Sequence, residues 1–166
     1  MASMYDFHKV IVGRAELLHF SDYKIADVPA KVDTGAYRSA IHANNIKLIE
    51  DDTKLQFDLL AGHPVCGALA QTITVENFKK VKIANSFGHE EERYEVWLRV
   101  KLGPRVFGAS FTLADRSKKI YPILLGRKLL NGRFLVDTMQ TSVNRIDLKK
   151  QYGIEMPQDE ELVEVQ

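Results

Sequence analysis

The sequence predicts a mainly β protein, a sheet or a barrel, with one short helix near its C-terminal end. Three observations support this prediction. β-Branched and aromatic residues recur in short runs that are separated by Gly, Pro, Asn and Asp. Several of these runs alternate apolar and polar residues, as half-buried strands do. A helical pattern is clear only over residues 124–133.

The expected strands, in chain order, occupy residues 8–13, 24–33, 39–49, 54–60, 71–83, 93–103 and 106–115. Alternation is clearest in residues 93–102, where every second residue from Tyr94 to Leu102 is apolar and faces one side. Glu95 and Trp97 face the other side. Polar or Gly-containing stretches at 61–67, 84–93 and 102–105 indicate hairpin tips. The expected helix, LLGRKLLNGR, ends at Gly132.

The composition is typical of one globular domain. The chain has 166 residues, 45% of them hydrophobic and 27% charged, with a formal net charge of +1. This near-neutral balance argues against a broad nucleic-acid-binding or membrane-binding face. We expect an N-terminal segment over residues 1–9, one domain over residues 10–150 and an acidic, mobile tail over residues 151–166.

The cysteine content and the hydropathy pattern indicate a cytoplasmic protein. Cys66 is the single cysteine, which excludes an intrachain disulfide framework and fits a reducing compartment. No apolar run approaches the roughly 20 residues of a membrane span, and the N-terminal residues lack the apolar stretch of a signal peptide.

Two segments carry the chemistry. In KVDTGA, an apolar strand is followed by Asp33, then Thr34, then Gly35, whose lack of a Cβ permits close backbone approach. In YPILLGRKLL, residues 121–130, an apolar run ends at Gly126 and enters the expected helix.

This pair of segments resembles the subunit of retropepsins within the aspartic protease superfamily. The matching residues are Asp33, Thr34, Gly35 and Ala36, and then Leu124, Leu125, Gly126 and Arg127. The resemblance implies a closed β-barrel in which two strands cross in a psi-shaped loop and hold the Asp at its centre. It also implies that Gly126 and Arg127 support the catalytic loop.

Further segments resemble one bacterial family, labelled as ATP-dependent zinc proteases and associated with RimK-type glutamate ligases. They are VGRAELLHF, VPAKVDTGAYRSAIHA, NSFGHEEER, LADRS, YPILLGR and FLVDT, and they span residues 10–138 in the order of that family. The motifs of this sequence support neither the ATP dependence nor the zinc in that family label. The sequence lacks both the His-Glu-x-x-His zinc motif and a phosphate-binding loop, so we expect neither a metal nor another cofactor, and any nucleotide dependence would come from a partner.

Catalysis by carboxylates requires two of them. Two carboxyl groups that lie about 3 Å apart share one proton, because both cannot ionise at that distance. One chain supplies one Asp-Thr-Gly, so the simplest arrangement is a two-fold homodimer that pairs the two copies of Asp33. Thr34 would then bond across the axis, and Ala36 would complete the loop. Asp137, in FLVDTMQT, lacks the following Gly and is interpreted as a turn or surface acid.

Residues 84–93 are expected to form a flap over the substrate, and the resemblance favours Ser86 and Gly88 as its binding residues. An ordinary hairpin tip is the alternative.

The residues after Ala36 differ from those of the retroviral relatives, which have acids where this sequence has Tyr37 and Arg38. Arg127 therefore lacks its usual partner, and Glu16 is either the replacement or a surface residue. Arg38 could receive a substrate carboxylate.

Several other residues have two possible roles. Arg14, Arg93 and Arg116 either add to an acidic-substrate subsite or are structural or solvated charges. His42 and His63 are either metal ligands or structural, and without a third spaced ligand the structural role is favoured. Cys66 is interpreted as a buried thiol, and Trp97 marks either a dimer face or a second buried layer.

The sequence therefore predicts a homodimeric aspartic peptidase with Asp33, Thr34 and Gly35 as catalytic residues and Ala36, Arg38, Ser86 and Gly88 in substrate binding. By resemblance, the substrate would be a polyglutamate or Glu-rich protein tail and a partner would be a RimK-type ligase. A non-catalytic module that binds acidic tails and a zinc-dependent hydrolase are the alternatives.

Overall fold

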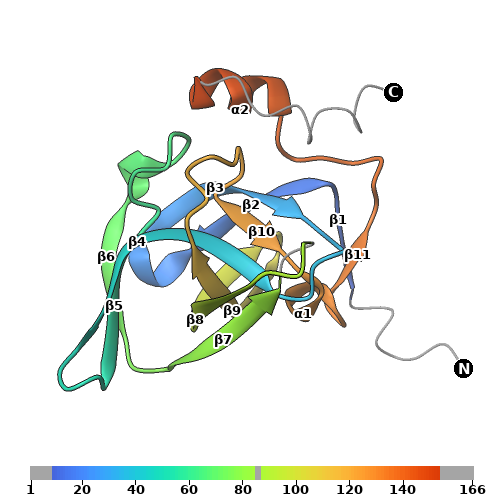
Figure 1. Cartoon of the computed structure of the whole chain (residues 1–166). Coiled ribbons are helices and arrows are strands. Elements are labelled where there is room, and N and C mark those ends of the chain that lie inside the picture. Colours follow the sequence, from blue (N-terminus) through green and yellow to red (C-terminus); the bar gives the residue numbers. More distant parts are fainter. Residues whose placement is uncertain (1–8, 85–86, 154–166) are drawn as a thin grey trace, which may run out of the picture.

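A computed structural model of the protein describes residues 9–84 and 87–153. It is mainly β, as predicted (Figure 1). The strands are β1 (Val10–Val12), β2 (Ala15–Phe20), β3 (Ile25–Val32), β4 (Ser39–Ile49), β5 (Lys54–Leu59), β6 (Gln71–Val75), β7 (Phe78–Ala84), β8 (Glu90–Leu102), β9 (Arg105–Ala114), β10 (Ile123–Leu125) and β11 (Phe134–Val136). Two α-helices, α1 (Arg127–Leu130) and α2 (Arg145–Tyr152), and two 3₁₀ turns, Ser21–Tyr23 and Gly67–Leu69, complete the described elements.

Six of the strands pair in a ring. The order is β10, β3, β2, β8, β9 and β4, and β10 also pairs with β4, which closes the ring. β5 and β6 extend the sheet from β4, and β7 pairs with β8. β1 and β11 form a separate parallel pair in which Ile11 lies opposite Leu135.

The core fills the inside of this ring. Alternate residues of β8 are buried, from Val96 to Leu102, as the period-two pattern predicted. Phe20 from β2 and Phe111 from β9 are both fully buried, with ring centroids 6.1 Å apart. Burial of such large apolar side chains is the main stabilising contribution to the sheet.

The structure corrects two expected elements. The run at 71–83 is two strands, β6 and β7, rather than one, and the expected helix is the single turn α1 rather than two turns. β2, β10 and β11 were not among the expected strands.

α2 was not predicted. Its first turn is capped by Asn144, whose side chain accepts hydrogen bonds from the N–H groups of Ile146 and Asp147. It ends at Gly153, which adopts φ +67°. Leu148 of α2 belongs to a second, smaller apolar cluster with Ile120. The packed part of the chain therefore continues to Tyr152, which is buried.

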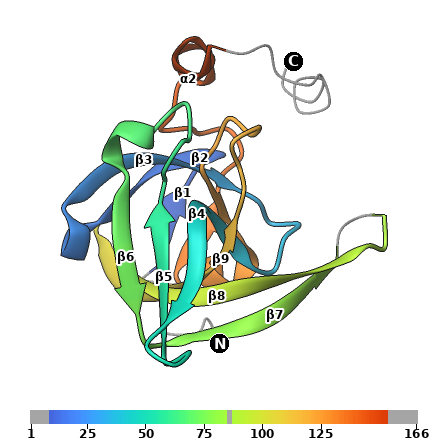
Figure 2. The same cartoon turned by 60° about the vertical axis from the view of Figure 1, so that its left-hand side comes forward.

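The β7–β8 hairpin extends away from the body of the molecule (Figure 2). Its ladder runs from the pair Phe78–Val96 to the pair Ala84–Glu90. The residues expected to form the flap lie at the end of this hairpin. Neither α-helix in the described ranges has the length and apolar character that crossing a bilayer requires.

Candidate active site

Asp33 follows β3 directly, at the point where β10 lies between β3 and β4. β10 pairs in parallel with β3 and antiparallel with β4, so the loop between β3 and β4 passes around the end of β10. The N–H of Asp33 donates to the carbonyl of Leu125 at 2.9 Å. This is the psi-shaped crossing that the resemblance implied, and it fixes the backbone that carries Asp33.

Gly126 allows the loop to cross this closely. A Cβ on Gly126 would lie 2.6 Å from the carbonyl oxygen of Arg38 and 2.7 Å from that of Tyr37. Its N–H donates to the buried Ser39 hydroxyl at 3.0 Å. The next two N–H groups, of Arg127 and Lys128, donate to the carbonyls of Ala36 (2.8 Å) and Tyr37 (2.9 Å). The start of α1 therefore holds the loop between β3 and β4, which carries Asp33, through backbone hydrogen bonds.

The loop presents the Asp33 carboxylate at the surface. One carboxylate oxygen, Oδ1, accepts the N–H of Gly35 at 2.9 Å, and the carbonyl of Asp33 accepts the N–H of Ala36 at 3.3 Å. A Cβ on Gly35 would lie 3.2 Å from Oδ1. Asp33 is half-buried, whereas Thr34 and Gly35 are exposed. Such a carboxylate is held in place and remains open to a water or to a second carboxyl group.

Arg127 contacts the loop through a backbone carbonyl and an aromatic ring rather than through an acidic side chain. Its guanidinium Nη1 donates to the carbonyl of Thr34 at 3.0 Å and lies over the Tyr37 ring, 5.8 Å from the centroid. Of the two roles considered for Glu16, no ion pair with Arg127 is present among the described residues. Glu16 instead accepts the N–H of Gly13 at 2.7 Å, in the turn between β1 and β2. The Tyr37 ring takes the place of the missing acid, because a guanidinium stacks favourably on an aromatic face.

A buried carboxylate, Glu95, connects the loop between β3 and β4 to β7 and to α1. Glu95 is 1% exposed and forms ion pairs with Arg38 of the loop, Lys79 of β7 at 3.6 Å and Lys128 of α1 at 3.3 Å. Its bond to Arg38 is charge-assisted and direct. Arg38 thus has an internal partner in the structure, which argues against its assigned role as a free carboxylate receptor.

Glu95 is a residue that sequence reasoning missed. Alternation placed it on the outward side of β8, together with Trp97. Trp97 is 37% exposed, and the ammonium groups of Lys79 and Lys128 lie over its ring, 5.7 and 5.8 Å from the centroid. No local pattern marks Glu95, since its three cations come from distant parts of the sequence.

The expected flap is the end of the β7–β8 hairpin. Gly88 has φ +77°, a conformation that favours glycine, and Phe87 is 85% exposed. Ser86 lies outside the described residues. Arg93 forms an ion pair with Glu91 within the hairpin, which places it in a structural role here.

Asp137 occupies a turn, as interpreted from the sequence. Its carboxylate accepts the N–H of Met139 and the side-chain amide of Gln140, both at 2.9 Å. These bonds are typical of an Asp that stabilises a turn rather than of a catalytic acid.

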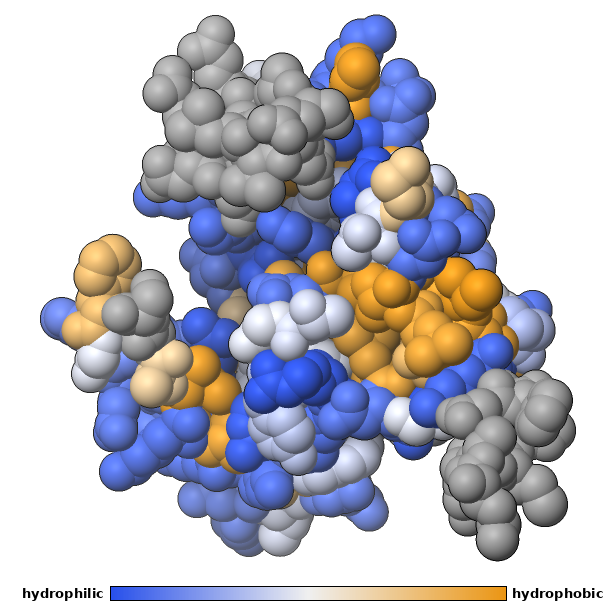
Figure 3. Space-filling view, turned by 90° about the vertical axis from the view of Figure 1, so that its right-hand side faces the viewer, coloured by the Kyte–Doolittle hydropathy of each residue, from blue (hydrophilic) through white to orange (hydrophobic). Residues whose placement is uncertain are grey.

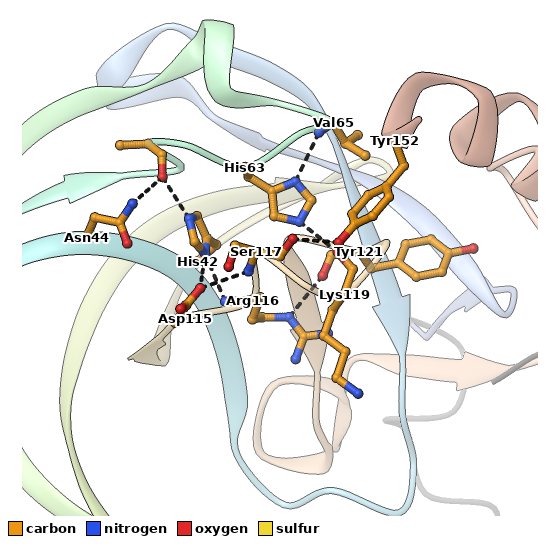
Figure 4. Close-up of polar contacts among 11 residues, drawn as sticks. His42, Asn44, His63, Val65, Asp115, Arg116, Ser117, Lys119, Tyr121 and Tyr152 are labelled. Atoms are coloured by element: carbon orange, nitrogen blue, oxygen red, sulfur yellow. Dashed lines mark hydrogen bonds and ion pairs between the residues drawn. The ribbon is translucent and has the colours of Figure 1, made fainter. Parts of the chain in front are cut away.

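His42 and His63 have structural partners (Figure 4). The Nδ1 of His42 accepts the N–H of Arg116 at 2.9 Å, and its Nε2 lies 2.7 Å from the Ala61 carbonyl. The Nδ1 of His63 accepts the N–H of Val65 at 3.1 Å, and its Nε2 lies 2.9 Å from the Lys119 carbonyl. Both rings are buried, and each uses both nitrogens as a neutral imidazole does.

Burial also sets the ionisation of this region. It lowers the pKa of His63 to about 4, and it raises the pKa of the Cys66 thiol to about 12. His63 is therefore uncharged near neutral pH, and Cys66 is a poor nucleophile.

Across the two described ranges, no cluster of three or more His, Cys, Asp and Glu side chains has the arrangement of a metal site. Arg116 donates to the Tyr121 carbonyl at 2.9 Å, which ties it to the same structural network.

The comparisons with known proteins agree with this geometry. Residues 11–146 match the model of a family described as RimB-like, retropepsin-like aspartic endopeptidase. A crystal structure of a Legionella pneumophila protein of unknown function superimposes with a TM-score of 0.64 at 29% identity, over 80% of this chain and 95% of that one.

Two curated relatives are each named "Probable alpha-L-glutamate ligase". The protein from Shewanella halifaxensis is 28% identical over 89% of this chain, and the protein from Desulfotalea psychrophila is 30% identical over 80% of it. The chain spans only 33% and 29% of the length of these two relatives.

Proposed function

The chain belongs to the family of RimB-like, retropepsin-like aspartic endopeptidases, and from this membership we propose that it hydrolyses peptide bonds with two copies of Asp33 in a homodimer. The observation that carries the proposal is the psi-shaped crossing, which holds one surface-facing carboxylate by backbone hydrogen bonds. In this proposal the six-stranded ring is the closed barrel of the family.

The chemistry needs one proton shared by the two carboxyl groups. The ionised Asp33 takes a proton from a bound water, whose oxygen attacks the carbonyl carbon of the substrate. The protonated Asp33 of the second subunit donates to the carbonyl oxygen. When the tetrahedral intermediate collapses, the C–N bond breaks, the leaving amine takes the proton that the first Asp33 removed from the water, and a hydroxyl of the intermediate returns a proton to the second Asp33.

The surface around β1 and β11 supports a homodimer. Figure 3 views the side on which Figure 1 places these strands, and apolar side chains gather there into a continuous area. Ile11 and Leu135, which lie opposite each other in the two-stranded sheet, are 56% and 51% exposed. An apolar area of this kind on a small domain marks an interaction surface. A second copy that covered it would exclude water from both apolar faces.

The proposed substrate is a polyglutamate or Glu-rich protein tail. The proposal rests on the relatives named as glutamate ligases, because a peptidase that resembles part of a ligase suits the removal of what such an enzyme adds. A RimK-type ligase in the cytoplasm is the proposed partner. Binding of acidic tails without cleavage is the second candidate function, since one Asp33 alone provides no dyad.

The direct test is the cleavage of a labelled Glu-rich peptide by the wild type and by Asp33→Asn. We expect Asp33→Asn to lower kcat by at least a hundredfold, because the amide can neither accept nor share the proton. Asp137→Asn, a change of the same kind in the turn, should leave kcat within about twofold. Equal loss in both variants would contradict the assignment of Asp33, and the loss of wild-type activity on chelation would favour a zinc-dependent hydrolase.

A further inference from the structure

A cavity of about 680 Å³ lies beside the catalytic loop. It is bounded by the end of β3 (Lys31 and Val32), by Thr34, and by the segment that runs from the end of β11 into α2. This volume is in the range of pockets that bind small molecules or single side chains of a peptide. Because Thr34 is next to Asp33, a ligand in this cavity would lie close to the proposed scissile bond.

The charges that line the cavity are all positive. Arg14, Lys31 and Arg145 contribute cations, and no Asp or Glu is present among the described residues that line it. Four acids adjoin the lining in the sequence, and none belongs to it: the carboxylate of Asp33 accepts the Gly35 N–H, that of Asp137 accepts from Met139 and Gln140, that of Glu16 accepts the Gly13 N–H, and Asp147 is exposed on α2. The field inside the cavity therefore favours an anion.

Arg14 and Lys31 differ in whether their side chains already have hydrogen-bond partners. Arg14 is anchored, because its Nη1 donates to the carbonyl of Thr138 at 2.8 Å. Lys31 is half-buried and makes no ion pair or side-chain hydrogen bond with another described residue. An ammonium in this situation keeps all three of its donors for a ligand. The hydroxyl of Thr34, also in the lining, could add a hydrogen bond to a carboxylate, whereas the Thr141 hydroxyl already donates to the Val143 carbonyl at 3.1 Å.

We infer that this cavity is a specificity subsite that binds the side-chain carboxylate of a substrate residue close to the cleaved bond, with Lys31 as its principal ligand. The inference rests on the proposed function for its position in the reaction. In this inference Lys31, rather than Arg38, receives the carboxylate of an acidic substrate, because the Arg38 guanidinium is already paired with Glu95. The ligand is the carboxylate of an acidic peptide, in extended conformation, presented beside Asp33.

The test measures binding separately from cleavage. Fluorescein-labelled pentaglutamate is titrated with Asp33→Asn protein, which cannot turn the peptide over, and with the same protein carrying Lys31→Gln or Lys101→Gln. Lys101 is an exposed lysine of β8 and serves as the matched control. We expect Lys31→Gln to weaken binding about tenfold, the usual loss for one charge-assisted hydrogen bond, and Lys101→Gln to leave it within about twofold.

Two further measurements complete the test. Labelled pentaglutamine should bind Asp33→Asn at least tenfold more weakly than pentaglutamate and should show no difference between the lysine variants, because it lacks the carboxylates. Thermal melting of each variant checks that the fold is retained, and Arg145→Gln offers a second substitution in the lining if Lys31→Gln does not fold.

The outcomes separate this inference from the proposed function. If pentaglutamate binds and Lys31→Gln weakens it, the subsite stands even where the wild type cleaves nothing. If the wild type cleaves the peptide while Lys31→Gln and Lys101→Gln bind it equally well, the subsite is wrong and the peptidase remains. Absence of pentaglutamate binding by every variant overturns the subsite.

Discussion

Gly126 is the residue on which the path of the loop that carries Asp33 depends most directly. A Cβ at this position would lie within 2.7 Å of two backbone carbonyl oxygens, those of Arg38 and Tyr37, and the Tyr37 carbonyl cannot move without breaking its bond to the N–H of Lys128 in α1. The steric conflict therefore involves backbone on both sides, which cannot be relieved by turning a side chain.

Gly126→Ala should lower the free energy of unfolding by about 3 kcal/mol, the upper end of what overpacking costs. Gly108→Ala is the matched control, because Gly108 lies in β9 with nothing within 4 Å of its ideal Cβ. Urea unfolding of both variants at one protein concentration measures the difference. If the two substitutions had the same small effect, the close crossing described here would be wrong.

The residues of the site differ in how far the sequence could predict them. Asp33, Gly35 and Gly126 belong to a contiguous motif whose backbone demands are local, so their arrangement could be anticipated. Glu16 could not be placed, because whether its carboxylate reaches Arg127 or the Gly13 N–H depends on a turn of three residues. Lys31 was not singled out, since a lysine within a strand has no signature until the cavity around it is known.

Among the elements, strands with strict alternation were predictable and the others were not. β8 was predicted because its apolar and polar residues alternate, and in the structure four of these apolar residues, every second one from Val96 to Leu102, are buried. β2 was missed because its register shifts at a bulge between Leu18 and Phe20, which interrupts the period of two. α2 was missed because only Leu148 and Tyr152 are buried, so it forms through its caps, at Asn144 and Gly153, rather than through an apolar face.

Glu95 connects three elements at once. Its carboxylate pairs with the loop that carries Asp33 through Arg38, with β7 through Lys79 and with α1 through Lys128. The three cations remain between 30% and 52% exposed, so water can hydrate them in part if the carboxylate is removed. The loss of Glu95 should therefore disturb the site more than it destabilises the whole domain.

Glu95→Gln should lower the free energy of unfolding by about 2 kcal/mol, because a charged hydrogen bond and two ion pairs to a buried group are lost. It should also raise KM for a Glu-rich peptide, since the flap strand and the loop lose their common anchor. Glu92→Gln, an exposed residue of the same strand, is the control and should change both quantities little. Unchanged stability and KM in Glu95→Gln would show that the three ion pairs do not hold these elements together.

At the scale of the whole molecule, the ring of strands brings the two halves of the motif together although they are distant in sequence. β10 inserts between β3 and β4 only because the ring closes, with β10 paired to both. The same closure leaves β1 and β11 outside the ring as a small sheet with exposed apolar side chains. The catalytic loop and this apolar surface are the two features that a second subunit would complete.

The most direct measurement of the central claim, a dyad shared between two subunits, mixes wild-type protein with Asp33→Asn protein at constant total concentration. After the subunits have exchanged, only dimers with two wild-type subunits carry both carboxyl groups. At equal amounts of the two proteins, cleavage of a Glu-rich peptide should fall to about one quarter of that of the wild type alone, because activity follows the square of the wild-type fraction. A fall to about one half would show that each chain acts by itself and would contradict the dyad.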